Sequence, residues 1–242
     1  MSLKLDVLAM APHPDDVELG CSGTLIKMVE MGKKVGVIDL TRGELGSRGS
    51  ADLRDQEAAR AGDIIGLAVR ENLRFRDGFF TYDEVHQRAI IQKIRKYRPE
   101  VLIMGAPEDR HPDHGKATKL IRDAAFLSGL IKIETEESGQ AQAPWRPKRM
   151  FSFIQDYNLT PSFVIDITEQ WEKKKEAILA YSSQFFHPGY ESNEPETYIS
   201  NGAFWKFLEA RARNMGHLVG AELGEGFVSE TPLLVQSPLD LL

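Results

Sequence analysis

The sequence predicts an α/β fold of the doubly wound, Rossmann-like type, with three α/β/α layers and a mainly parallel sheet. Short apolar runs, typical of strands buried on both faces, alternate along the 242 residues with longer segments of helical spacing. The first strand, helix and second strand form a βαβ unit, and such crossovers are almost always right-handed. Since no repeat or change of composition divides the chain, we expect one domain over residues 1–242.

The expected elements follow one another in regular order. Apolar runs predict strands at residues 4–11, 34–40, 71–75, 101–106, 149–157 and 163–167, and a short strand-like tail at 233–235. Helical spacing predicts helices at residues 20–32, 51–66, 82–98, 116–133, 168–181 and 198–215. Polar connections are expected at 41–50 and 134–148, and the turn-rich loop 186–196 is long enough to act as a lid.

Composition and charge exclude several classes of function. The formal net charge is −6 and the basic residues are scattered, which argues against a nucleic-acid partner or an acidic membrane surface. No apolar run approaches the roughly 20 residues of a membrane span. Cys21 is the only cysteine, so an internal disulfide and a Cys-rich zinc knuckle are excluded, and we expect a buried thiol. The first residues lack the apolar core of a signal peptide, and we therefore expect a cytoplasmic protein.

Two similar tetrads follow two of the predicted strands. His13-Pro14-Asp15-Asp16 comes after the first apolar run, and His111-Pro112-Asp113-His114 comes after the run at 101–106. In doubly wound sheets, ligands bind beyond the carboxyl ends of the strands. Two polar turns are the simpler interpretation, but turns rarely need both histidine and paired aspartate twice. Together the tetrads supply three metal ligands and leave a carboxylate and an imidazole, as metal-assisted hydrolysis requires.

The spacing within the tetrads indicates a catalytic metal site. His13 and Asp16, three residues apart, can turn toward one point, and His114 could complete the set from the neighbouring strand end. Two imidazoles and one carboxylate leave a fourth position for water, as in catalytic zinc sites, where the pKa of the water falls to about 7. Ferrous iron suits the same ligands.

The remaining tetrad residues suit acid–base roles. Asp15 is adjacent to Asp16, and since successive side chains cannot point the same way, it is better placed to accept a proton from the water than to bind metal. His111 can protonate a leaving nitrogen or stabilise a developing oxyanion. Asp113 could orient His111 and raise its pKa. The reaction indicated is hydrolysis of an unstrained acyl bond, for which an amide fits best.

Both tetrads, together with several longer stretches, resemble the zinc-dependent N-acetylglucosamine deacetylases of the PIG-L/LmbE superfamily. Within it, the chain is most similar to the deacetylases of bacillithiol biosynthesis. The supporting stretches, which span nearly the whole chain, are LTRGELGSRGS (40–50), LRDQEA (53–58), FRDG (75–78), EDRHPDH (108–114), YSSQF (181–185) and GEGFVSETPLLV (224–235). The resemblance implies a single LmbE-like domain and a homo-oligomer, often a hexamer built from trimers.

The resemblance also implies roles for the tetrad residues. Zinc is expected on His13, Asp16 and His114, with Asp15 as general base and His111 as acid or electrostatic stabiliser. The implied substrate is a small acetylated amino-sugar glycoside, N-acetylglucosaminyl malate, cleaved to glucosaminyl malate and acetate. Alternatives are a related amidase acting on chitin-derived disaccharides, on another sugar or on a thiol–sugar conjugate, and a ligand-binding module without catalysis.

Further residues are implied as substrate contacts, each with a simpler alternative. Arg54 is expected to bind sugar hydroxyls or a malyl carboxylate, although it also fits a solvated helix face. Asp77 is expected to accept from hydroxyls, although Asp-Gly is a natural turn. Arg110 and Arg149 are candidates near the carbonyl or the substrate acid, Arg149 fitting equally an edge-strand charge. Tyr198 falls where members of the subgroup carry a mobile tyrosine.

Overall fold

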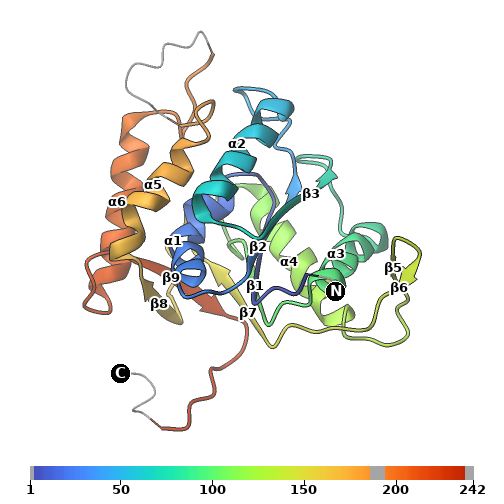
Figure 1. The fold of residues 1–242 in the computed structure, drawn as a ribbon. Coiled ribbons are helices and arrows are strands. Elements are labelled where there is room, and N and C mark those ends of the chain that lie inside the picture. The colour runs from blue at the N-terminus through green and yellow to red at the C-terminus, as the bar shows by residue number, and fades with distance from the viewer. Residues whose placement is uncertain (1–2, 186–193, 238–242) are drawn as a thin grey trace.

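The computed structural model describes residues 3–185 and 194–237, and its main feature is a twisted sheet between two layers of helices (Figure 1). In the described residues the sheet has seven strands in the order β3-β2-β1-β4-β7-β9-β8. Their bounds are β1 (Val7–Ala11), β2 (Val35–Thr41), β3 (Val69–Phe75), β4 (Val101–Met104), β7 (Arg149–Phe153), β8 (Phe163–Asp166) and β9 (Gly224–Ser229). The neighbouring strands β3, β2, β1, β4 and β7 are parallel to one another, whereas β9 is antiparallel to both β7 and β8. The predicted fold class is confirmed.

Helices cover both faces of the sheet. One face packs against α3 (Glu84–Tyr97) and α4 (Pro112–Leu127), and the other against α1 (Asp16–Glu30), α2 (Ala51–Ile65), α5 (Trp171–Leu179) and α6 (Gly202–His217). The alternating side chains of β1 supply both cores, because Leu8 and Met10 face one layer and Val7 and Ala9 face the other. Cys21 is buried in α1, as predicted. No helix within the described residues is long and apolar enough to cross a membrane.

The order of the strands explains why the two tetrads meet. From β1 the chain runs outward to β2 and β3, and it then returns to the other side of β1 to form β4. β1 and β4 are parallel neighbours, with Val7 opposite Val101. Their carboxyl ends therefore lie side by side where the strand order reverses, which is the position at which such sheets bind ligands. Both tetrads follow these two ends.

Two helices begin earlier than predicted, and both begin inside a tetrad. α1 starts at Asp16 and α4 at Pro112, rather than at residues 20 and 116. Proline in the first turn has no N–H that needs a partner, so Pro112 starts a helix instead of extending the loop. Each tetrad therefore lies at a helix N-terminus, where the backbone dipole favours negative charge.

The strand β9 is the main error in the predicted element order. The predicted strand-like tail at 233–235 is not a strand, and the strand lies at 224–229. Its sequence GEGFVS contains no apolar run, so the pattern did not indicate a buried strand. The strand can nevertheless bury Glu225, because this carboxylate forms an ion pair with Lys174, 2.5 Å away. A methyl group on Gly224 would lie 2.9 Å from the backbone nitrogen of Gly216, so the glycine allows α6 to pack closely on the strand.

The other differences are local. The connection 134–148 contains a small hairpin of β5 (Glu136–Glu137) and β6 (Gln140–Ala141). The helix predicted at 168–181 consists of a short 3-10 turn, η1 (Thr168–Gln170), followed by α5. Most of the proposed lid at 186–196 lies outside the described residues, since these do not include 186–193.

Candidate active site

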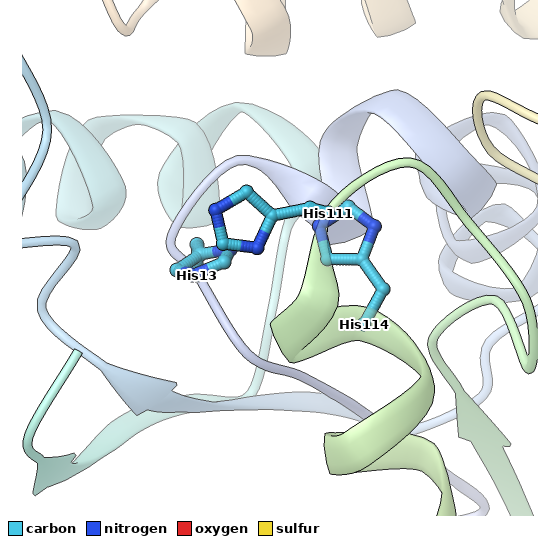
Figure 2. Close-up of side chains that lie close together, drawn as sticks. All are labelled: His13, His111 and His114. Atoms are coloured by element: carbon cyan, nitrogen blue, oxygen red, sulfur yellow. The ribbon is translucent and has the colours of Figure 1, made fainter. Parts of the chain in front are cut away.

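The two tetrads converge on one cleft of about 380 Å³ at the carboxyl ends of β1 and β4. His13 reaches it from the loop after β1, while His111 and His114 come from the start of α4 (Figure 2). The three rings lie next to one another, and the ring centroids of His13 and His111 are 4.7 Å apart. Two segments nearly a hundred residues apart in sequence thus place their imidazoles around one point.

Asp16 lies between two of these imidazoles. Its Oδ2 is 3.1 Å from His13 Nδ1, and its Oδ1 is 3.2 Å from His114 Nε2. Ligands held at 2.0–2.1 Å around a tetrahedral metal lie about 3.3 Å apart, so these separations match the edges of such a site. Burial acts to raise the pKa of Asp16, but the His114 and His13 imidazoles hold it well below its usual value. The predicted donor set, two imidazoles and one carboxylate, therefore suits a metal ion by its chemistry, and Asp16 lies within 3.2 Å of both rings.

The outer nitrogens of both imidazoles face carboxylates. His13 Nε2 lies 3.1 Å from Asp77 Oδ1, and His114 Nδ1 lies 2.6 Å from Asp109 Oδ2. Histidines that bind metals nearly always donate their second N–H to such a group, which fixes the tautomer and the ring orientation. The carboxylates therefore support the assignment of His13 and His114 as ligands.

Two of the supporting residues were not predicted from the sequence. Asp109 belongs to the EDRHPDH stretch, and its carboxylate also accepts the backbone N–H of Asp156 and of Tyr157. Gln155 follows β7, and its amide donates to Asp16 Oδ1 at 2.8 Å. Since β7 is the parallel neighbour of β4, a search for polar residues after every strand next to the tetrads would have found Gln155.

Within the described residues, two groups of three side chains have metal-binding atoms that all lie within 4.8 Å of one another, and neither includes Asp16. One consists of His13, His111 and His114, and the other of His13, Asp77 and Asp113. In the predicted set, Asp16 contacts His13 and His114 through different oxygens, and both imidazoles keep a carboxylate on the outer nitrogen.

Asp15 has an unusual backbone conformation beside the metal ligands. Its φ of 123° and ψ of −24° lie in a region that residues with a Cβ rarely adopt. Such strain persists only where the surroundings enforce it, and it is concentrated at functional sites. The side chain is buried, with 6% of the residue exposed. Burial raises the pKa of Asp15 to about 7, against the opposing effect of the Arg54 guanidinium.

Arg54 holds this conformation from the neighbouring helix α2. Its Nη2 lies 2.9 Å from Asp15 Oδ2 and donates to the carbonyl of Pro14 at 2.5 Å, while Nη1 donates to Gln184. The loop glycine Gly43 has a φ of +64°, and a methyl group there would lie 2.8 Å from Arg54 Nη1. The side chain lines the cleft, as predicted, but its guanidinium is engaged by the protein itself.

The relation between His111 and Asp113 differs from the prediction. It is the backbone N–H of Asp113, and not its carboxylate, that reaches His111, donating to Nδ1 at 3.2 Å. The carboxylate contacts Lys116 Nζ at 2.7 Å and accepts the N–H of Gly78 at 2.8 Å. Asp113 acts to raise the pKa of His111, as predicted, but burial and the imidazoles of His13 and His114 outweigh it, so the pKa is lowered overall.

At the mouth of the cleft, Arg110 and Tyr198 are linked through Asp156. The Tyr198 hydroxyl donates to Asp156 Oδ1 at 3.0 Å, and Arg110 Nε donates to Asp156 Oδ2 at 3.1 Å. The guanidinium also lies over the Tyr198 ring, 4.4 Å from its centroid. Both predicted residues therefore line the cleft, joined by an aspartate that was not predicted.

Arg149 lies elsewhere. It is the first residue of β7 and pairs with Val101 at the start of β4. It therefore lies at the amino ends of the strands, whereas the tetrads follow the carboxyl ends. The strand was correctly placed, but its direction puts this charge at the amino end. The prediction that Arg149 contacts the substrate is therefore a misassignment.

The fold and the paired tetrads define a doubly wound protein with a cleft at the switch point of its sheet, lined by side chains that could hold a metal ion. Residues 8–125 match the family model described as PIG-L, GlcNAc-PI de-N-acetylase. This match and the similarity to known deacetylases identify the chain as an enzyme of the class that hydrolyses amide bonds.

Individual proteins extend the similarity over nearly the whole chain. The crystal structure of the conserved protein TT1542 from Thermus thermophilus shares 37% identity, with a TM-score of 0.83 over 97% of this chain and 98% of that one. Diacetylchitobiose deacetylase of Thermococcus kodakarensis is 29% identical over 91% of this chain and 81% of its own length. The probable N-acetyl-alpha-D-glucosaminyl L-malate deacetylase 2 of Bacillus anthracis is 25% identical over 82% and 93%, respectively.

Proposed function

We propose that the chain is a metal-dependent deacetylase that removes the acetyl group from an N-acetylglucosaminyl glycoside and releases acetate. The observation that carries the proposal is the placement of Asp16 between His13 and His114, with the strained, buried Asp15 beside them. The match of residues 8–125 to the PIG-L family model supports the same reaction. The water oxygen adds to the amide carbonyl, the C–N bond breaks, and the amine leaves with a proton.

We infer that the cation is Zn²⁺, held by His13, Asp16 and His114. When bound, zinc would polarise the acetyl carbonyl and acidify a water molecule. Fe²⁺ prefers the same combination of two imidazoles and one carboxylate, so the donor atoms alone do not distinguish the two metals.

Asp15 is proposed as the general base. Arg54 holds Oδ2 at 2.9 Å and fixes the backbone through Pro14, so the carboxylate keeps one orientation at the cleft. A base held in place next to the attacking water accelerates such a reaction by about 10²- to 10⁴-fold.

His111 is proposed as the electrostatic stabiliser of the oxyanion. Its Nδ1 accepts the N–H of Asp113 at the start of α4, so a neutral ring carries its proton on Nε2. From Nε2 it can donate a hydrogen bond to the developing oxyanion, while the proton that Asp15 has taken from the water goes to the leaving nitrogen. The lowered pKa of His111 agrees with a ring that is neutral before the reaction.

We propose N-acetylglucosaminyl malate as the substrate. The sequence stretches shared with the bacillithiol subgroup and the similarity to the Bacillus anthracis protein over 93% of its length support it. Diacetylchitobiose is the second candidate, supported by the similarity to the Thermococcus kodakarensis enzyme. A cleft of about 380 Å³ is in the range of small-molecule sites.

An acetate-release assay tests both the reaction and the substrate. The purified zinc form is incubated with N-acetylglucosaminyl malate, diacetylchitobiose, N-acetylglucosamine and an acetylated thiol–sugar conjugate, and the metal-free protein is the control. We expect the malyl glycoside to be cleaved with the highest kcat/KM. Acetate release at the level of the metal-free control with every substrate would refute the proposal.

The single domain, the oligomeric state and the cytoplasmic location remain predictions.

A further inference from the structure

Asp77 connects the metal site with one wall of the cleft. Its Oδ1 lies 3.1 Å from His13 Nε2, and its Oδ2 accepts the backbone N–H of Leu45 at 3.0 Å. In return, the backbone N–H of Asp77 donates to Glu44 Oε1 at 2.8 Å. The turn at 76–80 and the glycine-rich loop at 43–49 are therefore joined in both directions, and Asp77 is the residue that reaches His13.

Asp77 is a buried residue that lines the cleft and is held by the protein itself. Only 5% of it is exposed, and both of its carboxylate oxygens lie against protein donors. A carboxylate offers about four lone-pair sites, so Asp77 can accept from the Leu45 N–H and from the His13 ring at the same time.

The side of His13 that Asp77 contacts determines whether the ring can bind metal. His13 Nδ1 faces Asp16, so Nδ1 is the ligand atom and must be free of hydrogen when the metal binds. The proton is then on Nε2, where Asp77 accepts it. Asp113 Oδ2 is a second acceptor at 3.4 Å, but that oxygen already accepts the N–H of Gly78.

We propose that Asp77 is a positioning residue of the metal site, which holds His13 in the metal-binding tautomer and links metal binding to the loop at 43–49. This inference rests on the proposed metal-dependent function and goes beyond it. With a metal ion held at Nδ1, the Nε2 proton would be a stronger donor, which would strengthen its hydrogen bond to Asp77 and hold in place the carboxylate that accepts the Leu45 N–H. Because coupling between two sites is reciprocal, a fixed loop also favours metal binding.

The first test measures zinc affinity in Asp77→Asn by competition with a chromogenic chelator, without substrate. The asparagine amide has one acceptor oxygen, so it cannot accept from both His13 and Leu45. If the oxygen stays at Leu45, the NH₂ group faces His13 Nε2 and favours the tautomer that cannot bind metal. We expect a loss of zinc affinity of about 10- to 100-fold, as for other residues that support metal ligands.

Glu44→Gln is the matched control. Its side chain contacts the backbone of Asp77 and keeps an acceptor oxygen after the substitution, so zinc affinity should change by less than about two-fold. Zinc affinity in Asp77→Asn at the wild-type level would overturn the inference, whatever happens to KM for the glycoside.

The second test needs no variant and therefore does not depend on the folding of Asp77→Asn. Hydrogen exchange of the Leu45 amide is followed by NMR in the wild-type protein with and without zinc. We expect slower exchange of this amide in the zinc form, and exchange that zinc does not change would exclude the coupling. Neither readout involves turnover, so failure of the inference and failure of the deacetylase proposal are distinguished by the acetate assay.

Discussion

The floor of the cleft and its rim differ in burial and in how their charges are paired. The floor consists of His13, Asp15, Asp16 and His114, each less than a tenth exposed and held by further buried side chains. The rim consists of Arg110, Asp156 and Tyr198. Tyr198 is 47% exposed, and half of the Arg110 side chain is in solvent.

This difference separates the chemistry from the choice of substrate. Buried charges fixed by several partners keep their geometry during a reaction, and removing one partner costs several kcal/mol. Exposed ion pairs contribute about 0–1 kcal/mol and can be exchanged for contacts with a ligand. We therefore expect substitutions in the floor to abolish metal binding or reduce kcat, and substitutions at the rim to change KM and the preference between substrates.

The largest effect is expected for His114→Ala. It removes one of the three proposed ligands and leaves Asp109 and Asp16 without the imidazole between them. Zinc content should fall close to zero by elemental analysis, and acetate release should fall to the metal-free level. His217→Ala, at the exposed end of α6, is the control and should keep both. A full zinc complement in His114→Ala would reject the ligand assignment.

The second largest effect is expected for Asp15→Asn, which keeps the shape of the side chain and removes the base. Asparagine tolerates a positive φ better than most residues, so the backbone should be preserved. We predict that kcat falls by about 10²- to 10⁴-fold while zinc content stays at the wild-type level. Unchanged turnover would exclude Asp15 as the base and leave the floor with a metal-binding role alone.

The floor could be predicted from the sequence far better than the residues that support it. The histidines and aspartates of the two tetrads are themselves typical metal ligands. The position of the site, where the strand order reverses between β1 and β4, is the usual ligand-binding position of such sheets. Gln155 was missed because its role arises only when β4 and β7 lie side by side. Asp109 was missed although it lies only five residues before His114, because nothing in its spacing marks it as the partner of the outer imidazole nitrogen. Arg149 was wrongly assigned because an apolar run does not show which end of its strand faces the site.

The missed strand β9 has a similar cause. A charge inside a strand normally argues against burial, but Glu225 accepts the backbone N–H groups of Gly23 and Thr24 and pairs with Lys174. These three partners come from α1 and α5, which are far from Glu225 in sequence. Patterns within a window of residues detect amphipathic elements, and they fail where a polar side chain is satisfied by distant segments.

Arg54→Gln tests whether Arg54 acts on kcat through Asp15, as expected for a residue that supports the floor of the cleft. The substitution removes a charged hydrogen bond to a buried carboxylate, which is worth about 1.5–3 kcal/mol, so kcat should fall by about 10- to 100-fold. KM should change little, and added guanidinium should restore part of the activity. An increase in KM with kcat unchanged would instead make Arg54 a substrate contact, as the sequence alone suggested.

Asp156→Asn should have the smallest effect, and it tests whether the rim selects the substrate. The substitution removes the negative charge that Arg110 and Tyr198 share, and it leaves the guanidinium positive and close to its present position. A malyl glycoside carries carboxylates and a chitin-derived disaccharide does not. KM for N-acetylglucosaminyl malate should therefore decrease by about two- to five-fold at low salt, corresponding to one exposed ion pair, while KM for diacetylchitobiose stays nearly constant. Added salt should remove the difference, because it screens charges at the surface. Equal changes for both substrates would mean that the charge of Asp156 does not take part in the choice, and would place specificity in the floor.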